Sequence, residues 1–500
     1  MSNQRDGSGQ QGALSLLLTL ATIVATASLL VREITDADTW WQVAIGRDIL
    51  THLAVPRIDH FAAAAYGRSY HDSHWLFQVV VALFDRLGGM KGVGVFTVMI
   101  WSATLLCCYR SVRVWLPHAA SCLVVFVVVM ACNERFTPRP DSVTCFMIAI
   151  FYSRLQLRKY GTIPETALLS FLQVVWSNSH GLFVIGPFMA GCYLLAAALR
   201  RWSGEEVELS STVKLFAVLS IASLVTPYGL DGWRYAMLLV KEAGPHSSVL
   251  FKTLEELSPT FGATARSYPD FWFFLTLLIA AVTSSVPMIK HRRVPYSRLF
   301  VVMALFIAAT SGRRNIPLFA LTAAPFIAEN IGRSWKRLLF SPSVKAALAL
   351  LLLGFSWLPF SGRYYQLLDY PERFGFGAQP SSFPSGLPTY LHKINFKGQL
   401  YNHDTLGGFC LYHGFLPLVD GRWEVYDESV LKKILAAPFD DDAWEWLVAT
   451  YHINGVILQN GREQTVALIP KLRKGRKFKM VYADDYSSFW LLNDRSKPEE

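Results

Sequence analysis

The sequence predicts an all-α polytopic membrane protein with about eleven transmembrane helices, followed by a small soluble C-terminal α/β domain. Apolar residues make up 52% of the 500 residues, and charged residues only 17%. Apolar runs of about 15 to 20 residues recur from Ala13 to Phe360, and runs of this length cross a bilayer as helices. A polar tail follows, in which β-like and helix-like segments alternate. We therefore expect a transmembrane domain over residues 1–360 and an α/β domain over residues 361–500.

The first apolar run, Ala13–Val31, opens the membrane part. It is long and has no small-x-small cleavage site before Arg32, which favours a retained span over a cleaved signal peptide. The expected spans are 13–31, 93–109, 117–132, 142–157, 164–178, 182–199, 212–226, 270–288, 297–310, 315–331 and 345–360.

Basic residues in short loops indicate the orientation of these spans. With the N-terminus in the cytoplasm, every strongly basic loop falls on the cytoplasmic side, as the positive-inside rule predicts. The odd number of spans then makes the C-terminal domain extracytoplasmic. The net charge of +10 therefore reports topology, and we expect no nucleic-acid partner. These basic loops are 109–113, 154–159, 200–201, 290–293 and 333–337.

A long first external loop, residues 32–92, contains two expected helices at the membrane surface. One lies near Thr39–Leu53, with Trp40 and Trp41 at head-group depth. The other lies near His74–Leu87 and is apolar over only about ten residues, which is short for a span. We interpret it as re-entrant or juxtamembrane, because a span here would invert the later topology.

The tail begins with a linker rich in Pro, Gly and Ser over 374–388. Short β-like runs follow at 399–401, 416–419, 455–458, 479–482 and 489–492. Helix-like segments lie between them near 405–412, 428–436, 441–452 and 463–471. This alternation predicts a small α/β sheet domain.

Acidic residues of the first loop are candidate catalytic groups. Asp36 and Asp38 lie one residue apart, so they can share a divalent cation, or one can act as a base that the other orients. A helix N-cap is the alternative. Asp72 is a candidate base or metal ligand, and His74 a candidate ligand or phosphate contact. A helix cap explains this second cluster equally well.

Two arginine pairs fall on the external face, against the positive-inside rule. Arg135 and Arg139 precede one span in a proline-containing turn, and Arg313 and Arg314 precede another. Guanidinium groups bind phosphate bidentately, which favours a site for an anionic head group. Snorkelling to lipid head groups is the alternative.

Three further residues are candidates for accessory or acceptor-binding roles. His180 lies in a turn between two spans, where a structural histidine is the more common interpretation. Asp420 and Arg422 follow a β-like run, and α/β domains commonly place ligand sites at strand ends. A turn with an Asp–Arg pair explains them nearly as well.

The order of these motifs resembles a known superfamily. The chain has Asp36-Ala37-Asp38-Thr39-Trp40-Trp41 in its first loop, then Asp72 before a helix, then Arg139-Pro140-Asp141 at a span entry. With alternating spans and a soluble C-terminal domain, this resembles the GT-C superfamily of polyprenyl-phosphate-sugar-dependent glycosyltransferases. That superfamily includes protein mannosyltransferases, the aminoarabinose transferase of lipid A and oligosaccharyltransferase catalytic subunits. The similarity is greatest to uncharacterised bacterial members.

The resemblance implies an enzyme of the bacterial inner membrane. It would move a hexosyl or pentosyl group from a polyprenyl-phosphate donor to a glycan, lipid or protein acceptor on the extracytoplasmic face. In the superfamily an acidic residue of the first external loop is catalytic, and it matches Asp38 or Asp36, with Asp72 as a second acid. The His-Pro-Pro element of mannosyltransferase-like members is replaced by His71-Asp72-Ser73-His74, so donor specificity is not carried over.

On this basis Asp38 is the expected general base. Mg or Mn bound by Asp36, Asp38 and Asp72 is a candidate cofactor. The residues expected to hold the donor phosphate are Arg135, Arg139, Arg313, Arg314 and His74.

Two other functions stay open. A lipid or solute transporter would show inverted repeats and ionisable residues at mid-span. A non-catalytic membrane assembly protein would keep its function when Asp38 is replaced by Asn.

Overall fold

The computed structural model describes residues 2–156, 162–242, 258–334, 340–474 and 477–493. Two of the expected basic loops lie partly outside these residues, at 157–159 and 335–337. The chain separates into two compact units. We call residues 1–32 and 94–375 the helical unit, and residues 33–93 and 376–500 the loop–tail unit. The first loop, expected as part of the transmembrane domain, thus groups with the C-terminal tail.

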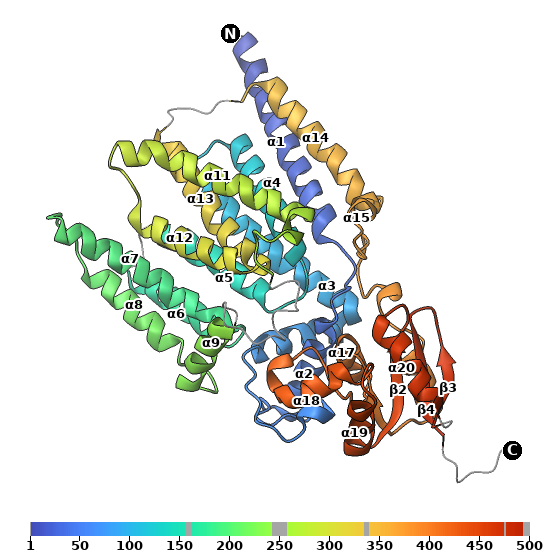
Figure 1. Ribbon diagram of the computed structural model, residues 1–500. Coiled ribbons are helices and arrows are strands. Elements are labelled where there is room, and N and C mark those ends of the chain that lie inside the picture. Colours follow the sequence, from blue (N-terminus) through green and yellow to red (C-terminus); the bar gives the residue numbers. More distant parts are fainter. Residues whose placement is uncertain (1, 157–161, 243–257, 335–339, 475–476, 494–500) are drawn as a thin grey trace. The chain divides into compact units, whose positions relative to one another are not determined.

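The helical unit consists of the helices shown in Figure 1, and the eleven expected spans all fall on helices of this unit. The helices of the unit, which include α9 and α15 outside the expected spans, are α1 (Ser2–Leu30), the second part of α3 (Trp75–Arg113), α4 (His118–Cys132), α5 (Asp141–Gln156), α6 (Ile163–Ser177), α7 (Ile185–Trp202), α8 (Ser210–Ala222), α9 (Leu230–Glu242), α11 (Pro269–Lys290), α12 (Tyr296–Ser311), α13 (Ile316–Ser334), α14 (Pro342–Phe360) and α15 (Arg363–Leu367).

Six helical segments of the described chain are long and apolar enough to cross a membrane. The chain is therefore an integral membrane protein, but the expected number of eleven spans is not confirmed. Two other apolar helices, α8 and α12, contain 13 and 16 residues. A helix that short does not reach across a bilayer of ordinary thickness without tilt or local thinning.

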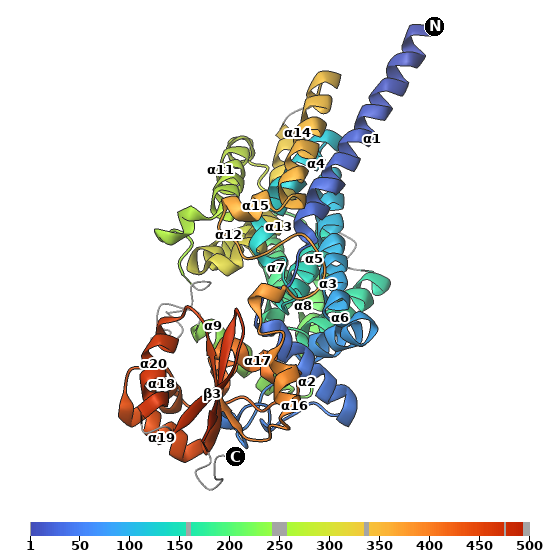
Figure 2. The same cartoon turned by 90° about the vertical axis from the view of Figure 1, so that its right-hand side faces the viewer.

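Small side chains bring the membrane helices into close contact. α1 and α14 run side by side (Figures 1 and 2). Ala21 and Ala25 of α1 cluster with Ala349 of α14 and with Ala119 and Cys122 of α4. Small residues at such interfaces let helix backbones approach, which is the usual way membrane helices associate.

Helix α3 breaks at a glycine pair. Gly89 has φ +59°, a left-handed conformation that favours glycine, and Gly88 is also non-helical. The first part of α3, before this break, belongs to the loop–tail unit. The helix expected near His74–Leu87 is therefore present and ends at the break.

The loop–tail unit is a mixed sheet covered by helices on both faces. Its strands run in the order β1-β2-β4-β3; β1 and β2 are parallel, and the other two pairings are antiparallel. α16 and α17 cover one face, and α18, α19 and α20 the other (Figure 2). The elements are α2 (Asp38–His52), α16 (Leu387–Lys393), β1 (Gln399–Tyr401), α17 (Asp404–Tyr412), α18 (Glu428–Ala436), α19 (Asp441–Tyr451), β2 (Ile453–Gln459), α20 (Glu463–Arg473), β3 (Phe478–Ala483) and β4 (Ser487–Leu492).

The alternation of side chains along each strand explains the two helical layers. Leu400, Ile457 and Phe489 pack with α16 and α17 in one cluster. On the other face, the Tyr401 ring lies 5.1 Å from that of Trp444 in α19. The two faces of the sheet therefore contact different helical layers, and the expected small C-terminal sheet is confirmed.

One of the five expected strands is wrong. Residues 416–419 form no strand, because their backbone groups bond elsewhere. The Pro417 and Leu418 carbonyl oxygens accept from the amides of Ala63 and Ala64 at 2.9 and 3.0 Å. The Leu418 amide donates to the Asn402 side chain at 2.8 Å, and Pro417 has no N–H. This segment therefore joins the first loop to the tail.

Candidate functional site

Helix α2 of the first loop packs tightly on α17 of the tail. The contact depends on Gly408, where a Cβ would lie 2.8 Å from the Trp41 amide nitrogen. The ring of Trp40 lies 5.0 Å from Phe409 and 4.8 Å from Tyr412. Trp40 and Trp41 are 5% and 6% exposed. These indoles therefore form part of the protein core and are not open to lipid head groups.

Asp38 is the first residue of α2, and its carboxylate is held from two sides. Its Oδ1 accepts a hydrogen bond from Trp41 Nε1 at 3.0 Å. A Cβ added to Gly421 would lie 2.2 Å from the same oxygen, so only glycine permits this approach. Asp36 Oδ1 accepts a hydrogen bond from the Asp38 amide at 3.1 Å, while the N-cap position of α2 is occupied by Ala37.

Gly421 is held in place by its two neighbours, which form a buried ion triad with the first loop. Arg422 Nη2 contacts Asp420 Oδ2 at 2.6 Å, and Arg422 Nη1 contacts Asp59 Oδ2 at 2.6 Å. The side chains of Arg422 and Asp59 are fully buried. The Tyr426 hydroxyl donates to Asp420 Oδ1 at 2.9 Å. The predicted Asp–Arg pair is therefore present and is extended by an acid that sequence reasoning missed.

The charge of Arg422 also acts on Asp72. Asp72 Oδ1 accepts the His74 amide at 3.0 Å and Gln78 Nε2 at 3.1 Å, so the helix-capping interpretation holds for this residue. Burial raises its pKa to about 7, although the His74 amide and the charge of Arg422 favour the ionised form. Asp72 therefore titrates near neutrality.

The expected metal site is not formed by the described chain. Within it, no three His, Cys, Asp or Glu side chains are gathered as a group that could hold a metal ion. Asp36, Asp38 and Asp72 therefore do not fit a shared metal site.

In the helical unit, Arg313 is engaged by two carboxylates. Its Nε lies 3.0 Å from Asp270 Oδ2 and its Nη2 lies 3.0 Å from Glu134 Oε2. Its guanidinium lies 3.4 Å from the centre of the Tyr268 ring, and the Tyr370 hydroxyl donates to Glu134 at 2.5 Å. Sequence reasoning missed these partners, since no motif marks Glu134 or Asp270.

Arg135 and His180 also lie in this unit. Arg135 donates through Nε and Nη2 to Asp141 Oδ2, at 2.8 and 2.5 Å. His180 Nδ1 lies 2.7 Å from Thr144 Oγ1. Desolvation, and then the charges of Arg314 and Arg135, lower the pKa of His180. His180 is thus a neutral histidine in a polar network, and the effect of both arginine charges on its pKa shows that Arg135 and Arg314 lie near it.

Comparison with known proteins gives the fold. No protein-family model matches the sequence, and no curated protein matches it. Among solved structures, the Archaeoglobus fulgidus oligosaccharyltransferase matches with a TM-score of 0.62 at 13% identity, over 96% of this chain and 75% of that one. The A. fulgidus oligosaccharyltransferase AglB, bound to an inhibitory peptide and a dolichol-phosphate, matches with a TM-score of 0.63 at 12% identity, over 97% and 75%.

Two further structures show the same architecture. ArnT from Cupriavidus metallidurans has a TM-score of 0.56 at 14% identity, over 96% of this chain and 98% of that one. The mycobacterial arabinofuranosyltransferase AftD has a TM-score of 0.51 at 12% identity, over 97% of this chain and 40% of that one. The chain has the fold of these GT-C glycosyltransferases, as its motifs predict.

Proposed function

We propose that the protein is an integral membrane glycosyltransferase that uses a polyprenyl-phosphate sugar and acts on the extracytoplasmic face of a bacterial inner membrane. The observation that carries the proposal is the position of Asp38. In a chain with the GT-C fold, this first-loop carboxylate is oriented by an indole N–H and lies against the Gly421 backbone. The fold alone is compatible with other activities, whereas a carboxylate held in this way is suited to a defined proton transfer.

In the proposed reaction, Asp38 takes the proton of an acceptor hydroxyl or amine. The acceptor atom bonds to the anomeric carbon while the bond from that carbon to the phosphate oxygen breaks. The electron pair leaves with the polyprenyl phosphate, and the anomeric centre inverts. The step is a displacement in which Asp38 is the general base.

The Asp420-Gly421-Arg422 segment is proposed to position Asp38. Arg422 is fixed by two buried carboxylates. Gly421 lies between Asp420 and Arg422 in the sequence, and its lack of a side chain sets how closely Asp38 approaches the backbone. A network in which each member is satisfied is rigid, so the segment restricts the carboxylate to one orientation. Asp420 and Arg422 are thus positioning residues in this proposal.

We assign the binding of the donor phosphate to the arginines because of the chemistry of the guanidinium group. Guanidinium groups stabilise the charge that develops on a leaving phosphate. Arg135 and Arg313 are already paired with carboxylates, which reduces their local net charge. The role is proposed for Arg135, Arg139, Arg313 and Arg314 together, with His74 as an additional contact.

The test is a strain of the source organism that lacks this chain and is complemented with wild type, Asp38→Asn or Asp48→Asn. Asp48 is a matched control, because it lies on the same helix and, among the described residues, forms its ion pairs with the histidines His52 and His60. Membranes are assayed for the polyprenyl-phosphate sugar that accumulates without the enzyme. Asp38→Asn should lower turnover about 100- to 10,000-fold, since a general base contributes about that much, and Asp48→Asn should not.

Equal rescue by all three variants would instead support a non-catalytic assembly protein. Loss of uptake without accumulation of a lipid-linked sugar would support a transporter.

Positioning is tested separately with Gly421→Ala. The added methyl group must displace the Asp38 carboxylate, and a shift of about 1 Å can lower kcat about 100-fold. KM for the donor should stay unchanged, and Gly421→Ala should add little to the defect of Asp38→Asn because both act on one group. Gly354→Ala is the control, since no atom lies within 4 Å of its added Cβ. Additive losses in the double variant would show that Gly421 does not act through Asp38.

A further inference from the structure

A pocket opens at the carboxyl ends of the parallel strands β1 and β2, inside the loop–tail unit. β1 ends at Tyr401 and β2 at Gln459, and both residues line the pocket. This edge of parallel strands is where α/β sheets commonly bind ligands. The empty volume of about 640 Å³ at this pocket includes open solvent.

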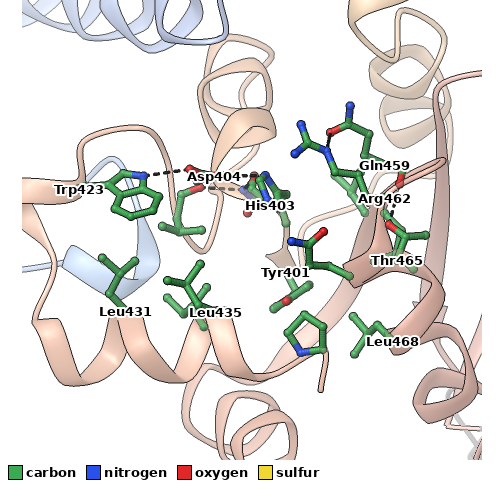
Figure 3. A pocket seen from close by; sticks show the side chains of 17 residues that line it. Tyr401, His403, Asp404, Trp423, Leu431, Leu435, Gln459, Arg462, Thr465 and Leu468 are labelled. Carbon is green, nitrogen blue, oxygen red and sulfur yellow. Dashed lines mark hydrogen bonds and ion pairs between the residues drawn. The ribbon is translucent and has the colours of Figure 1, made fainter. Parts of the chain in front are cut away.

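The pocket has two unlike sides (Figure 3). Leu431 and Leu435 of α18 and Leu468 of α20 form an aliphatic side. Hydrogen-bonding groups from the strand ends gather across from them. The residues of this polar side are His403, Asp404, Gln459 and Arg462.

The Trp423 indole also lines the pocket and is fixed by a hydrogen bond to the polar side. Its Nε1 donates to Asp404 Oδ2 at 2.9 Å. The Asp404 carboxylate is itself held by His403 Nδ1 at 2.6 Å and by the Thr405 amide at 2.9 Å. The indole therefore presents a preset surface to a ligand, with little rotamer freedom left to lose on binding.

Arg462 is oriented but retains donors. Its Nε donates to Gln459 Oε1 at 2.9 Å. In the part of the chain that the structure describes, no hydrogen bond or ion pair engages its two terminal nitrogens. An ordered guanidinium with spare donors at a pocket rim is suited to a ligand rich in oxygen atoms.

We propose that this pocket binds a carbohydrate unit and that the acceptor of the transfer proposed above is a glycan; the second part rests on that function. A sugar ring has an apolar C–H face and a rim of hydroxyl groups. The aliphatic side and the fixed indole match the C–H face. The guanidinium, imidazole and amide groups match the hydroxyl rim. An acyl chain would place only methylene groups against these polar atoms and leave them unsatisfied.

The experiment measures ligand binding by the full chain in lipid nanodiscs, which avoid detergents with sugar head groups. The probes are the methyl glycosides of glucose, galactose, mannose, N-acetylglucosamine and arabinofuranose, followed by saturation-transfer-difference NMR. At least one glycoside should bind, and Trp423→Ala or Arg462→Ala should weaken its binding about tenfold or more. Arg473→Ala, at the other end of α20, is the control for Arg462 and should bind as wild type does.

Trp423→Phe separates ligand contact from folding, because it keeps an aromatic ring and loses only the bond to Asp404. It should retain most of the binding. Asp38→Asn should bind the glycoside normally while transfer fails, so the two proposals fail independently. Binding of sodium octanoate without any glycoside would overturn the inference. Glycoside binding that survives both Trp423→Ala and Arg462→Ala would overturn it as well.

Discussion

Each unit of the molecule contains an ion triad whose central residue is fully buried, and these two triads have opposite composition. In the loop–tail unit, Arg422 lies between the acids Asp59 and Asp420. In the helical unit, Glu329 lies between Arg298 and Arg333, with Arg333 Nη2 at 2.5 Å from Glu329 Oε1. The first triad has one excess negative charge, and the second one excess positive charge.

The triads also differ in how completely their atoms are hydrogen-bonded. Asp59 Oδ1 accepts the amides of Phe61 and Ala62, while its other oxygen accepts from Arg422. In the second triad, buried Arg298 Nε and Glu329 Oε2 find no hydrogen-bond partner in the described chain. The saturated triad is the one next to the candidate catalytic carboxylate. The comparison indicates that saturation serves orientation, whereas the looser triad only joins helices.

The largest expected effect is that of Arg422→Ala. It leaves two carboxylates facing each other in a fully buried site, and the loss of one partner of a buried pair costs about 3–5 kcal/mol. We expect this decrease in the free energy of unfolding of the purified protein, measured by denaturant titration followed by tryptophan fluorescence.

The matched control is Arg68→Ala in the same unit. Arg68 is about half exposed and pairs with Asp427 at 3.7 Å, so its loss should cost less than about 1 kcal/mol. If both variants lose the same stability, the Asp59–Arg422–Asp420 triad is not a special element of the fold.

A smaller effect is expected for Glu329→Gln. The substitution leaves two arginines without their carboxylate, but Arg333 is about a third exposed and can turn toward solvent. Arg298 also keeps its bond to the Gln156 carbonyl oxygen at 3.3 Å. We expect a loss of about 1–3 kcal/mol in the same unfolding assay. Glu205→Gln, in an exposed pair with Arg200, is the control and should change stability little; a loss larger than that of Arg422→Ala would reverse the proposed ranking.

The two regions also differ in how far the sequence predicts them. The helices and four strands of the tail follow from alternating local patterns, because the same local residues determine element type and packing face. The strand expected at 416–419 is absent because Pro417 has no N–H and the Asn402 side chain accepts the Leu418 amide, so neither amide can join a sheet. A hydropathy pattern contains neither of these two pieces of information. The helical spans follow from hydropathy, but a run of about 15 residues does not reveal whether a helix crosses the bilayer.

The candidate site shows a sharper limit. Asp38 and the Asp420–Arg422 pair were found as separate motifs, since each has a recognisable local pattern. Their contact through Gly421 was not, because only the tertiary fold brings these segments together. The core packing of Trp40 was missed for a related reason: an apolar residue near a span is equally suited to lipid and to a protein core. Asp59 has no motif at all.

The smallest expected effect is a pH dependence that distinguishes the site next to Arg422 from the other triad. Folding raises the pKa of Asp72 from 3.8 to about 7, chiefly by burial. Between these values the folded state holds a proton that the unfolded chain releases, so this stabilisation is present at low pH and is lost as pH rises through 7. From pH 6 to pH 8 the loss is about 1 kcal/mol. The free energy of unfolding should fall by that amount in wild type and stay flatter in Asp72→Asn, which keeps a hydrogen-bond acceptor for Gln78. Parallel profiles for the two proteins would show that Asp72 is ionised throughout, and its burial beside Arg422 would then have no role near neutral pH.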